Sequence, residues 1–342
     1  MRTIISILAV SAGLAACQNA LPVHEIHASA ETVRVAGTGD AADDPALWLA
    51  PDPAQSLILG TDKTAGLYAY ELDGSIHSFL PVGRLNNIDV RAGFDLPGPA
   101  RDIAVATDRT NTALAVFLID TEAREIEAWP VIPLDDVAEP YGTCLYRSPV
   151  DGALYAFVTD KDSGIVVQLL LRYDGEGRIS GDEVRRFVTG SITEGCVADD
   201  RTGQLYINEE NVAVWAIGAE PGDGTVLTRL AAVDGRHIIA DAEGAAILDR
   251  GEAGGWLIVS SQGDSTYTAY DLESGEFAAR FRISDGVVDG VTHTDGLEVI
   301  TTPLGPDYPA GVMLVQDDED DEGGQNFKII DLREVIAVLG GD

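Results

Sequence analysis

The sequence predicts an all-β fold, specifically a six-bladed β-propeller. Apolar, strand-like segments recur six times along the chain, and a polar loop precedes each of them at a similar distance. The chain is also rich in turn residues, with 37 glycines and 15 prolines among 342 residues. Each repeat unit of about 45 to 55 residues contains one polar loop and one apolar segment and is long enough for four short strands. This organisation is typical of propeller blades.

The composition is that of a soluble globular protein with a strong negative charge. It has 57 acidic residues against 22 basic ones, a formal net charge of −35, so we expect no nucleic-acid partner. Bound divalent cations are one way to neutralise clustered carboxylates in such a chain. A highly soluble surface is the alternative explanation.

The N-terminal residues indicate export. An apolar run from Ile4 to Leu14 follows Met1-Arg2 and is shorter than the roughly 17 residues that a membrane-spanning helix needs. The run ends in Leu14-Ala15-Ala16-Cys17, which resembles a bacterial lipobox, whose cysteine becomes lipidated. Gln18 stands where an aspartate would retain a lipoprotein at the inner membrane, so the resemblance implies an outer-membrane lipoprotein.

These features divide the chain into three parts. We expect residues 1–17 to be a lipoprotein-type signal peptide, residues 18–35 a tether, and residues 36–342 the propeller. Cleavage after Ala28-Ser29-Ala30 is the alternative, and it would give a periplasmic or secreted protein. We expect a monomer that contacts a membrane only through the N-terminal lipid.

Each of the six apolar segments ends in a short polar tripeptide. The tripeptides are Thr61-Asp62-Lys63, Thr107-Asp108-Arg109, Thr159-Asp160-Lys161, Asn208-Glu209-Glu210, Ser260-Ser261-Gln262 and Gln316-Asp317-Asp318. Another alternating apolar segment follows most of them, so we expect the tripeptides to lie between two strands of a blade.

The polar loops that precede these segments form a second repeating set. They are Asp43-Asp44-Pro45-Ala46, Asn86-Asn87-Ile88-Asp89, Glu139-Pro140-Tyr141-Gly142, Thr193-Glu194-Gly195-Cys196, Asp241-Ala242-Glu243-Gly244 and Thr294-Asp295-Gly296-Leu297. We expect them to begin the innermost strands. They would then surround one end of the central channel and bring acidic side chains close to one axis.

The basic residues of the tripeptides suggest a phosphate site. The chain has three lysines against nineteen arginines, and Lys63 and Lys161 hold the same repeat position, which Arg109 holds in the second repeat. An ammonium group and a guanidinium fork both suit phosphate oxygens. The alternative is that they are solvated turn residues that balance Asp62 and Asp160. Because cations from three blades and carboxylates from the others converge on one end of the channel, phosphate is the simpler interpretation.

The acidic residues of the repeats suggest a metal. They are hard oxygen ligands with no histidine or cysteine beside them, which favours calcium over zinc. The candidate ligands are Asp43, Asp44, Glu194, Glu209, Glu210, Asp241, Glu243 and Asp295. The chain lacks a G-x-S-x-G elbow, an H-E-x-x-H motif, a P-loop and a dinucleotide fingerprint, so metal-activated water is the leading candidate for any hydrolysis.

The chain resembles the β-propeller phytases over about 300 residues from Asp43 onward. The motifs that carry the resemblance are Asp43 to Trp48, Gly60 to Lys63, Gly83 to Arg91, Glu139 to Gly142, Thr193 to Gly195, Asn208 to Asn211, Asp241 to Gly244, Ser260 to Ser265 and Gln325 to Lys328. The resemblance implies a six-bladed propeller that hydrolyses phytate, myo-inositol hexakisphosphate, using several calcium ions. The substrate would be the calcium complex of phytate.

The resemblance also implies roles for single residues. The scissile phosphate would be held by Lys63, Arg109, Tyr141 and Lys161. Glu194 and Glu243 would bind calcium and a bridging water that attacks phosphorus. Glu209 and Asp241 would line a neighbouring phosphate pocket, in which Asn211 stands where an acidic residue is common. Further calcium ligands would be Asp44, Gln262 and Asp295.

Some expectations remain open at this point. A calcium-stabilised propeller that acts as a surface binding module is the alternative function. A lactonase on a similar scaffold is disfavoured, because a neutral lactone has no use for three cations. Export makes a disulfide between Cys144 and Cys196 possible. Leu332 to Leu339 has helical spacing, and a strand near Glu31 to Val35 is a candidate to close the ring with the last blade.

Overall fold

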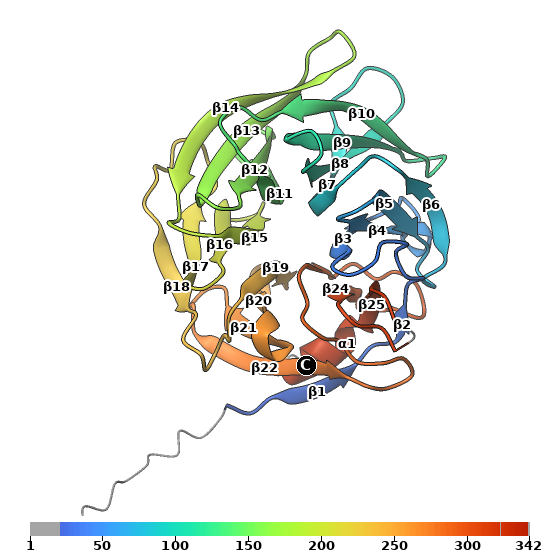
Figure 1. The fold of residues 1–342 in the computed structure, drawn as a ribbon, viewed down its shortest axis with the longest axis vertical. Coiled ribbons are helices and arrows are strands. Elements are labelled where there is room, and N and C mark those ends of the chain that lie inside the picture. The colour runs from blue at the N-terminus through green and yellow to red at the C-terminus, as the bar shows by residue number, and fades with distance from the viewer. Residues whose placement is uncertain (1–20, 322, 341–342) are drawn as a thin grey trace, which may run out of the picture.

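The computed structural model describes residues 21–321 and 323–340, and it confirms the predicted all-β, six-bladed propeller. Six sheets stand around a central channel (Figure 1). Four sheets have four strands that follow one another along the chain, one sheet has four such strands and a fifth from the N-terminus, and one has three and a fourth from the N-terminus. All of the pairings between consecutive strands of a blade are antiparallel.

In every blade the first strand borders the channel and the later strands lie progressively farther out. Blade 1 has β3 (Ala42–Trp48), β4 (Leu57–Asp62), β5 (Gly66–Tyr70) and β6 (Ile76–Leu80). Blade 2 has β7 (Leu85–Phe94), β8 (Arg101–Asp108), β9 (Ala113–Asp120) and β10 (Ile126–Pro133). Blade 3 has β11 (Pro140–Arg147), β12 (Leu154–Asp160), β13 (Ile165–Tyr173) and β14 (Ile179–Val188).

The remaining blades follow the same plan. Blade 4 has β15 (Thr193–Asp199), β16 (Gln204–Glu209), β17 (Ala213–Gly218) and β18 (Thr228–Ala232). Blade 5 has β19 (Ala242–Asp249), β20 (Gly255–Ser261), β21 (Thr266–Asp271), β22 (Phe277–Ser284) and β1 (His24–His27). Blade 6 has β23 (Leu297–Ile300), β24 (Val312–Asp317), β25 (Asn326–Asp331) and β2 (Ala30–Glu31). Short 3-10 turns span Pro53–Gln55, Gly251–Ala253 and Gln262–Asp264.

Burial explains why the second strand of each blade reads as a continuous apolar run. Every residue of β4, β12 and β24 is buried, because neighbouring blades cover both faces of these strands. The outer strand β6 is mostly exposed or half-buried. Each apolar cluster is shared by adjacent blades: Val105 of blade 2, for example, belongs to the same cluster as Val158 of blade 3.

The ring is closed by the N-terminal segment. Strand β2 pairs antiparallel with β25, and the Thr32 amide donates to the Phe327 carbonyl at 2.9 Å, so the candidate closing strand lies at Ala30–Glu31 and continues toward Val35. Strand β1 adds to β22 in parallel, and Ile26 is buried there. The predicted tether over residues 18–35 is therefore wrong from His24 onward, because this stretch supplies strands to two blades.

A buried lysine ties the closing strand to blade 6. The Lys328 ammonium is fully buried and pairs with Glu31 of β2, with Asp289 and, at 3.3 Å, with Asp317. Although burial disfavours the charged form, hydrogen bonds to Asp289 and Glu31 raise the pKa of Lys328 above its ordinary value. The ring closure thus combines backbone pairing with a charged cluster.

The C-terminus confirms the predicted helix. Helix α1 (Leu332–Val338) is preceded by its N-cap residue Asp331, whose side chain accepts from the Arg333 amide. Leu332 and Val335 pack into the cluster that also contains Ile26, so both ends of the described chain stabilise the same region. The predicted signal peptide and its Cys17 lie outside the described residues. Within residues 21–321 and 323–340, no helix has the length and apolar character needed to cross a membrane.

Candidate functional site

The inner strands carry their polar loops in the same irregular conformation. Register shifts interrupt five inner strands near their N-terminal ends, between Ala42 and Pro45, Leu85 and Ile88, Pro140 and Thr143, Thr193 and Cys196, and Ala242 and Ala245. Each gap spans two residues of a predicted polar loop. Because bulges re-aim side chains, two residues per blade are turned out of the ladder at one end of the channel.

Glycines let these loops approach one another. A Cβ on Gly142 would lie 1.8 Å from the Glu194 carbonyl oxygen, and one on Gly195 would lie 2.2 Å from that of Glu243. The Gly244 amide donates to the Asp295 carbonyl at 2.7 Å. The residues that follow Tyr141, Glu194 and Glu243 therefore have no room for a side chain, and this closeness brings carboxylates of successive blades together.

We expect Gly195→Ala to destabilise the folded protein by about 1–3 kcal/mol, the usual cost of overpacking. The added methyl group would collide with backbone and push β15 away from β19. Chemical denaturation measures the effect. Gly222→Ala is the matched control, because a Cβ there has nothing within 4 Å. Equal stability of the two variants would contradict the close-approach argument.

A disulfide also joins two of the inner strands. Cys144 of β11 and Cys196 of β15 are bonded, with their Cα atoms 5.7 Å apart, which settles the question that the sequence left open. The bond lies directly after the loops that carry Tyr141 and Glu194. It therefore links the two blades at the level of the channel mouth.

The side chain of the first residue of each tripeptide forms a hydrogen bond with the backbone of an inner loop. The Thr107 hydroxyl donates to the Tyr141 carbonyl at 2.6 Å, and the Ser260 hydroxyl donates to the Thr294 carbonyl at 2.7 Å. The Asp295 amide donates to the Gln316 side chain at 2.8 Å. These contacts fix the loops from which the site residues project.

The second residue caps a turn and faces away from the channel. Asp62 accepts from the Thr64 amide at 2.8 Å. Glu209 is the equivalent residue of blade 4, and it accepts from the Ser191 hydroxyl at 2.6 Å and from the Trp215 indole at 2.8 Å. Both of its oxygens are thus used within its own blade. The expected ligand role of Glu209 is not supported by this geometry, whereas its neighbour Glu210 does reach the channel mouth.

Five of the six third residues line one pocket of about 510 Å³ at the channel mouth; Arg109 is not among the lining residues. The described residues that line it are Asp40, Lys63, Tyr141, Lys161, Ile192, Glu210, Asp241, Glu243, Gln262, His293, Asp295 and Asp318. Most of the predicted site residues are in this set. Asp40, His293 and Asp318 were not predicted.

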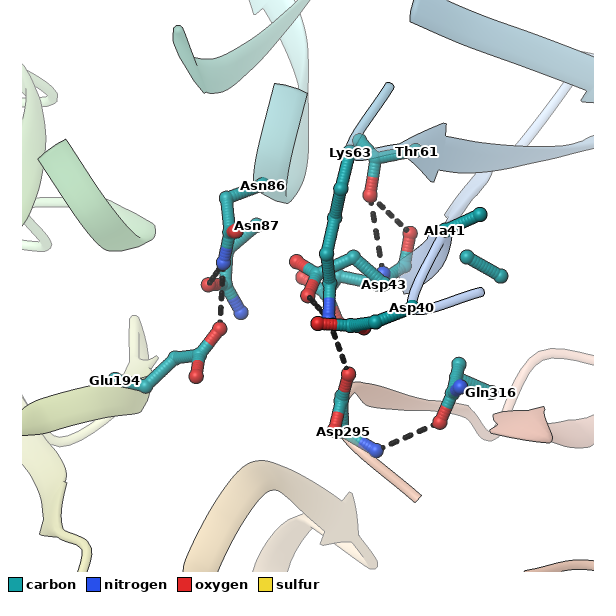
Figure 2. Close-up of polar contacts among 12 residues, drawn as sticks. Asp40, Ala41, Asp43, Thr61, Lys63, Asn86, Asn87, Glu194, Asp295 and Gln316 are labelled. Carbon is teal, nitrogen blue, oxygen red and sulfur yellow. Dashed lines mark hydrogen bonds and ion pairs between the residues drawn. The ribbon is translucent and has the colours of Figure 1, made fainter. Parts of the chain in front are cut away.

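Lys63 lies at the centre of the acidic side chains (Figure 2). Its ammonium donates to Asp40 and, at 2.6 Å, to Asp295, and it forms an ion pair with Asp43 at 3.2 Å. Burial opposes the charged form, but the carboxylates of Asp43 and Asp295 raise the pKa of Lys63 well above its ordinary value. Lys63 is therefore a permanent cation.

Tyr141 lies between the other two cations. The Lys161 ammonium is 4.7 Å from the centre of the Tyr141 ring, and the Arg109 guanidinium carbon is 6.0 Å from it. Arg109 is oriented by ion pairing with Glu139 and by donation to the Asn86 side chain at 3.2 Å. Burial, together with nearby Glu194, raises the pKa of Tyr141 far above its ordinary value, so the phenol remains a hydrogen-bond donor.

Three buried carboxylates face each other beside these cations. Oxygens of Glu194, Glu210 and Glu243 all lie within 4.8 Å of one another. Asn86 donates to Glu194 at 2.6 Å, as Figure 2 shows, but one oxygen of Glu243 is buried without a hydrogen-bond partner. Burial raises the pKa of Glu243 well above its ordinary value and that of Glu210 to about 7, with Glu194 contributing in both cases.

Asp43 and Asp295 extend this acidic group toward Lys63. The Asp43 carboxylate is fully buried and accepts no hydrogen bond apart from its ion pair with Lys63. Gln262 donates to Asp295 at 2.6 Å. Burial raises the pKa of Asp295 to about 6. Buried carboxylate oxygens without a hydrogen-bond partner, such as those of Asp43 and Glu243, are costly unless a cation binds them. Carboxylate oxygens are hard ligands, which suit calcium.

Two predicted ligands lie apart from this group. Asp44 is buried below the mouth, where it accepts from the Ile88 amide at 3.0 Å and lines a small channel cavity with Asp89 and Glu298. Asp241 lines the rim of the mouth pocket and is half-buried. The structure therefore separates the set around Glu194, Glu210 and Glu243 from Asp44, which is buried deeper in the channel, and from Asp241 at the rim.

Comparisons with known proteins agree with this architecture. The family described as Phytase matches residues 2–342. A 3-phytase of Bacillus subtilis (strain 168) is 39% identical over 329 residues, which cover 92% of this chain and 86% of that protein. Regucalcin of Agrobacterium tumefaciens strain C58, described as a calcium-binding protein, has a TM-score of 0.55 at 15% identity over 90% of this chain and 95% of its own. At that identity the structural likeness shows the fold alone.

Proposed function

The chain belongs to the phytase family, and from this premise we propose how its channel mouth performs phytate hydrolysis. The enzyme releases phosphate from phytate. The observation that carries the assignment of the site is a pocket lined by two lysines and a tyrosine, with Arg109 beside the tyrosine ring and a tight group of buried carboxylates next to them. One half of this arrangement suits phosphate, and the other half suits metal ions.

The cationic half would hold the phosphate that is cleaved. Lys63 and Lys161 supply compact ammonium groups, and Arg109 supplies a planar fork that is already oriented by Asn86 and Glu139. The protonated Tyr141 phenol can donate to a further phosphate oxygen. Because these donors are fixed before substrate binds, they stabilise the charge of the transition state without reorganising.

The acidic half would hold calcium. Glu194, Glu210 and Glu243 are the core ligands, and Asp43 and Asp295 lie on the side of Lys63. Bound calcium would supply Lewis-acid charge for phosphate oxygens and would lower the pKa of a coordinated water. Asp241 and Gln262 also line the pocket, where they could serve a neighbouring phosphate. Both Glu209 and Glu210 were expected to be ligands, and this arrangement uses Glu210 alone.

The test is phosphate release from phytate near neutral pH. We expect release in the presence of added calcium and none in excess chelator, because without a cation the carboxylates repel the anionic substrate. Undiminished release in chelator would refute the calcium requirement. No release under either condition, from protein shown to be folded, would favour the calcium-stabilised binding module instead.

We also propose that the mature protein is an exported lipoprotein anchored through Cys17 at the outer membrane. The proposal rests on the Leu14-Ala15-Ala16-Cys17 motif and on Gln18. The described chain joins the propeller through β1, on the outer side of blade 5, so the anchor would leave the channel mouth open (Figure 1).

A further inference from the structure

His293 stands out among the residues that line the mouth pocket. It is exposed, and it is the one histidine of the described chain that lines this pocket. The rings of His77 and His237 are paired with Glu71 and Asp234, respectively, at 2.8 and 2.7 Å. The His293 ring has no such partner within the described residues.

The backbone presents this imidazole in a fixed way. His293 has a φ of 43°, a left-handed conformation that costs roughly 1 kcal/mol or more in a residue with a side chain. The Ser265 hydroxyl oxygen accepts from its amide at 3.1 Å, and Ser265 is itself left-handed, with a φ of 53°. Residues with strained backbone conformations, such as these two with positive φ, cluster at binding sites in proteins.

Both neighbours of His293 are anchored. The Thr292 amide donates to Asp317 at 2.9 Å, and the Thr294 carbonyl accepts from Ser260 at 2.7 Å. The Thr294 side chain also contacts the Tyr267 hydroxyl and is buried. An exposed imidazole is therefore held on a rigid support, which reduces the entropy lost when it binds a ligand.

The charge distribution indicates what this imidazole meets. The two lysines that line the pocket come from blades 1 and 3, whereas the side formed by blades 4 to 6 presents Glu210, Asp241, Asp295 and Asp318. Phytate carries phosphate on every carbon of its ring, so groups other than the cleaved one must face that side. Gln262 donates one N–H to Asp295, and the imidazole N–H of His293 is a further neutral donor that can approach an anion there.

We propose that His293 determines specificity by donating a hydrogen bond from its imidazole N–H to a phosphate of the substrate that is not being cleaved. This inference rests on the proposed function of the mouth pocket. The neutral ring suffices, because either tautomer has one N–H. His293 thereby favours an ester that carries several phosphates over a single phosphate group.

The test compares His293→Ala with wild type in saturating calcium, with phytate and its products followed by ion chromatography. We expect KM for phytate to rise about tenfold, the effect of losing one hydrogen bond to a charged group, with kcat within twofold. The inhibition constant of inorganic phosphate, which needs only the cleavage pocket, should not change. His293→Gln retains an N–H donor and should recover most of the affinity.

His24→Ala is the matched control, because His24 is exposed on the outer strand β1. Wild-type KM in His293→Ala, or an equal loss of affinity for inorganic phosphate, would overturn the inference. A wild-type protein that releases no phosphate from phytate would instead overturn the proposed function, so the two failures are distinguishable.

Discussion

Lys63→Met lowers kcat for phytate by at least about 10²–10³-fold, the usual loss when one fixed donor to a transition-state anion is removed. Methionine preserves most of the volume of the lysine stem and removes only the charge and its hydrogen bonds. The cleaved phosphate loses the donor nearest to Asp43 and Asp295. Initial rates at saturating calcium and phytate measure the loss, and circular dichroism verifies the fold.

The same substitution has a second effect that separates the two tasks of Lys63. In chelator, the buried Asp43 carboxylate and Asp295 lose their cation, and removing one partner of a buried pair costs about 3–5 kcal/mol. Calcium should restore most of this stability, since it would bind the same oxygens. We therefore expect the variant to unfold early in chelator and near the wild-type midpoint in calcium.

Lys161→Met is the matched control, because Lys161 holds the same tripeptide position in blade 3 but forms no ion pair within 4.0 Å among the described residues. It should lose turnover without the large loss of stability in chelator. Wild-type kcat in Lys63→Met would remove this residue from phosphate binding. Equal stability of the two variants in chelator would remove its role as a counter-ion.

The sequence predicts the propeller well because the fold is repetitive. Each blade carries separate signals for its second strand and its inner loop, so agreement among six units outweighs doubt about any single strand. The N-terminal strands were missed for the opposite reason. Strand β1 has four residues, β2 has two, and they pair with partners more than 250 residues away, so nothing local signals them.

The limits of the site prediction have a similar origin. Glu209 and Glu210 are adjacent acids, and only the alternation of side chains along β16 decides which one reaches the channel. Alignment of the tripeptides contains that signal, since Glu209 corresponds to the turn-capping Asp62 and Glu210 to Lys63. Asp40 and His293 had no comparable signal, because they are single residues at positions that the other blades do not repeat.

In chelator, the stability of the protein should fall as the pH rises from about 5 to 8. Burial raises the pKa of Glu210 to about 7, that of Asp295 to about 6 and that of Glu298 to about 8. In the unfolded chain these carboxyls ionise near 4 to 4.5. Between those values the folded state binds more protons than the unfolded state, so the free energy of unfolding decreases with rising pH. We expect the melting temperature to drop by about 5–10 °C.

Calcium should cancel or reverse this slope. The ion binds ionised carboxylates of the folded state, so its stabilisation grows with pH over the same range in which proton loss destabilises the metal-free protein. Thermal melting at pH 5 and pH 8, each in chelator and in calcium, measures both slopes.

Glu243→Gln removes one buried ionisable group and one ligand. It should therefore flatten the pH dependence of stability in chelator and also weaken the stabilisation by calcium. Stability that rises with pH in chelator, or calcium stabilisation equal at both pH values, would contradict the idea that Glu210, Asp295 and Glu298 hold protons when no metal is bound.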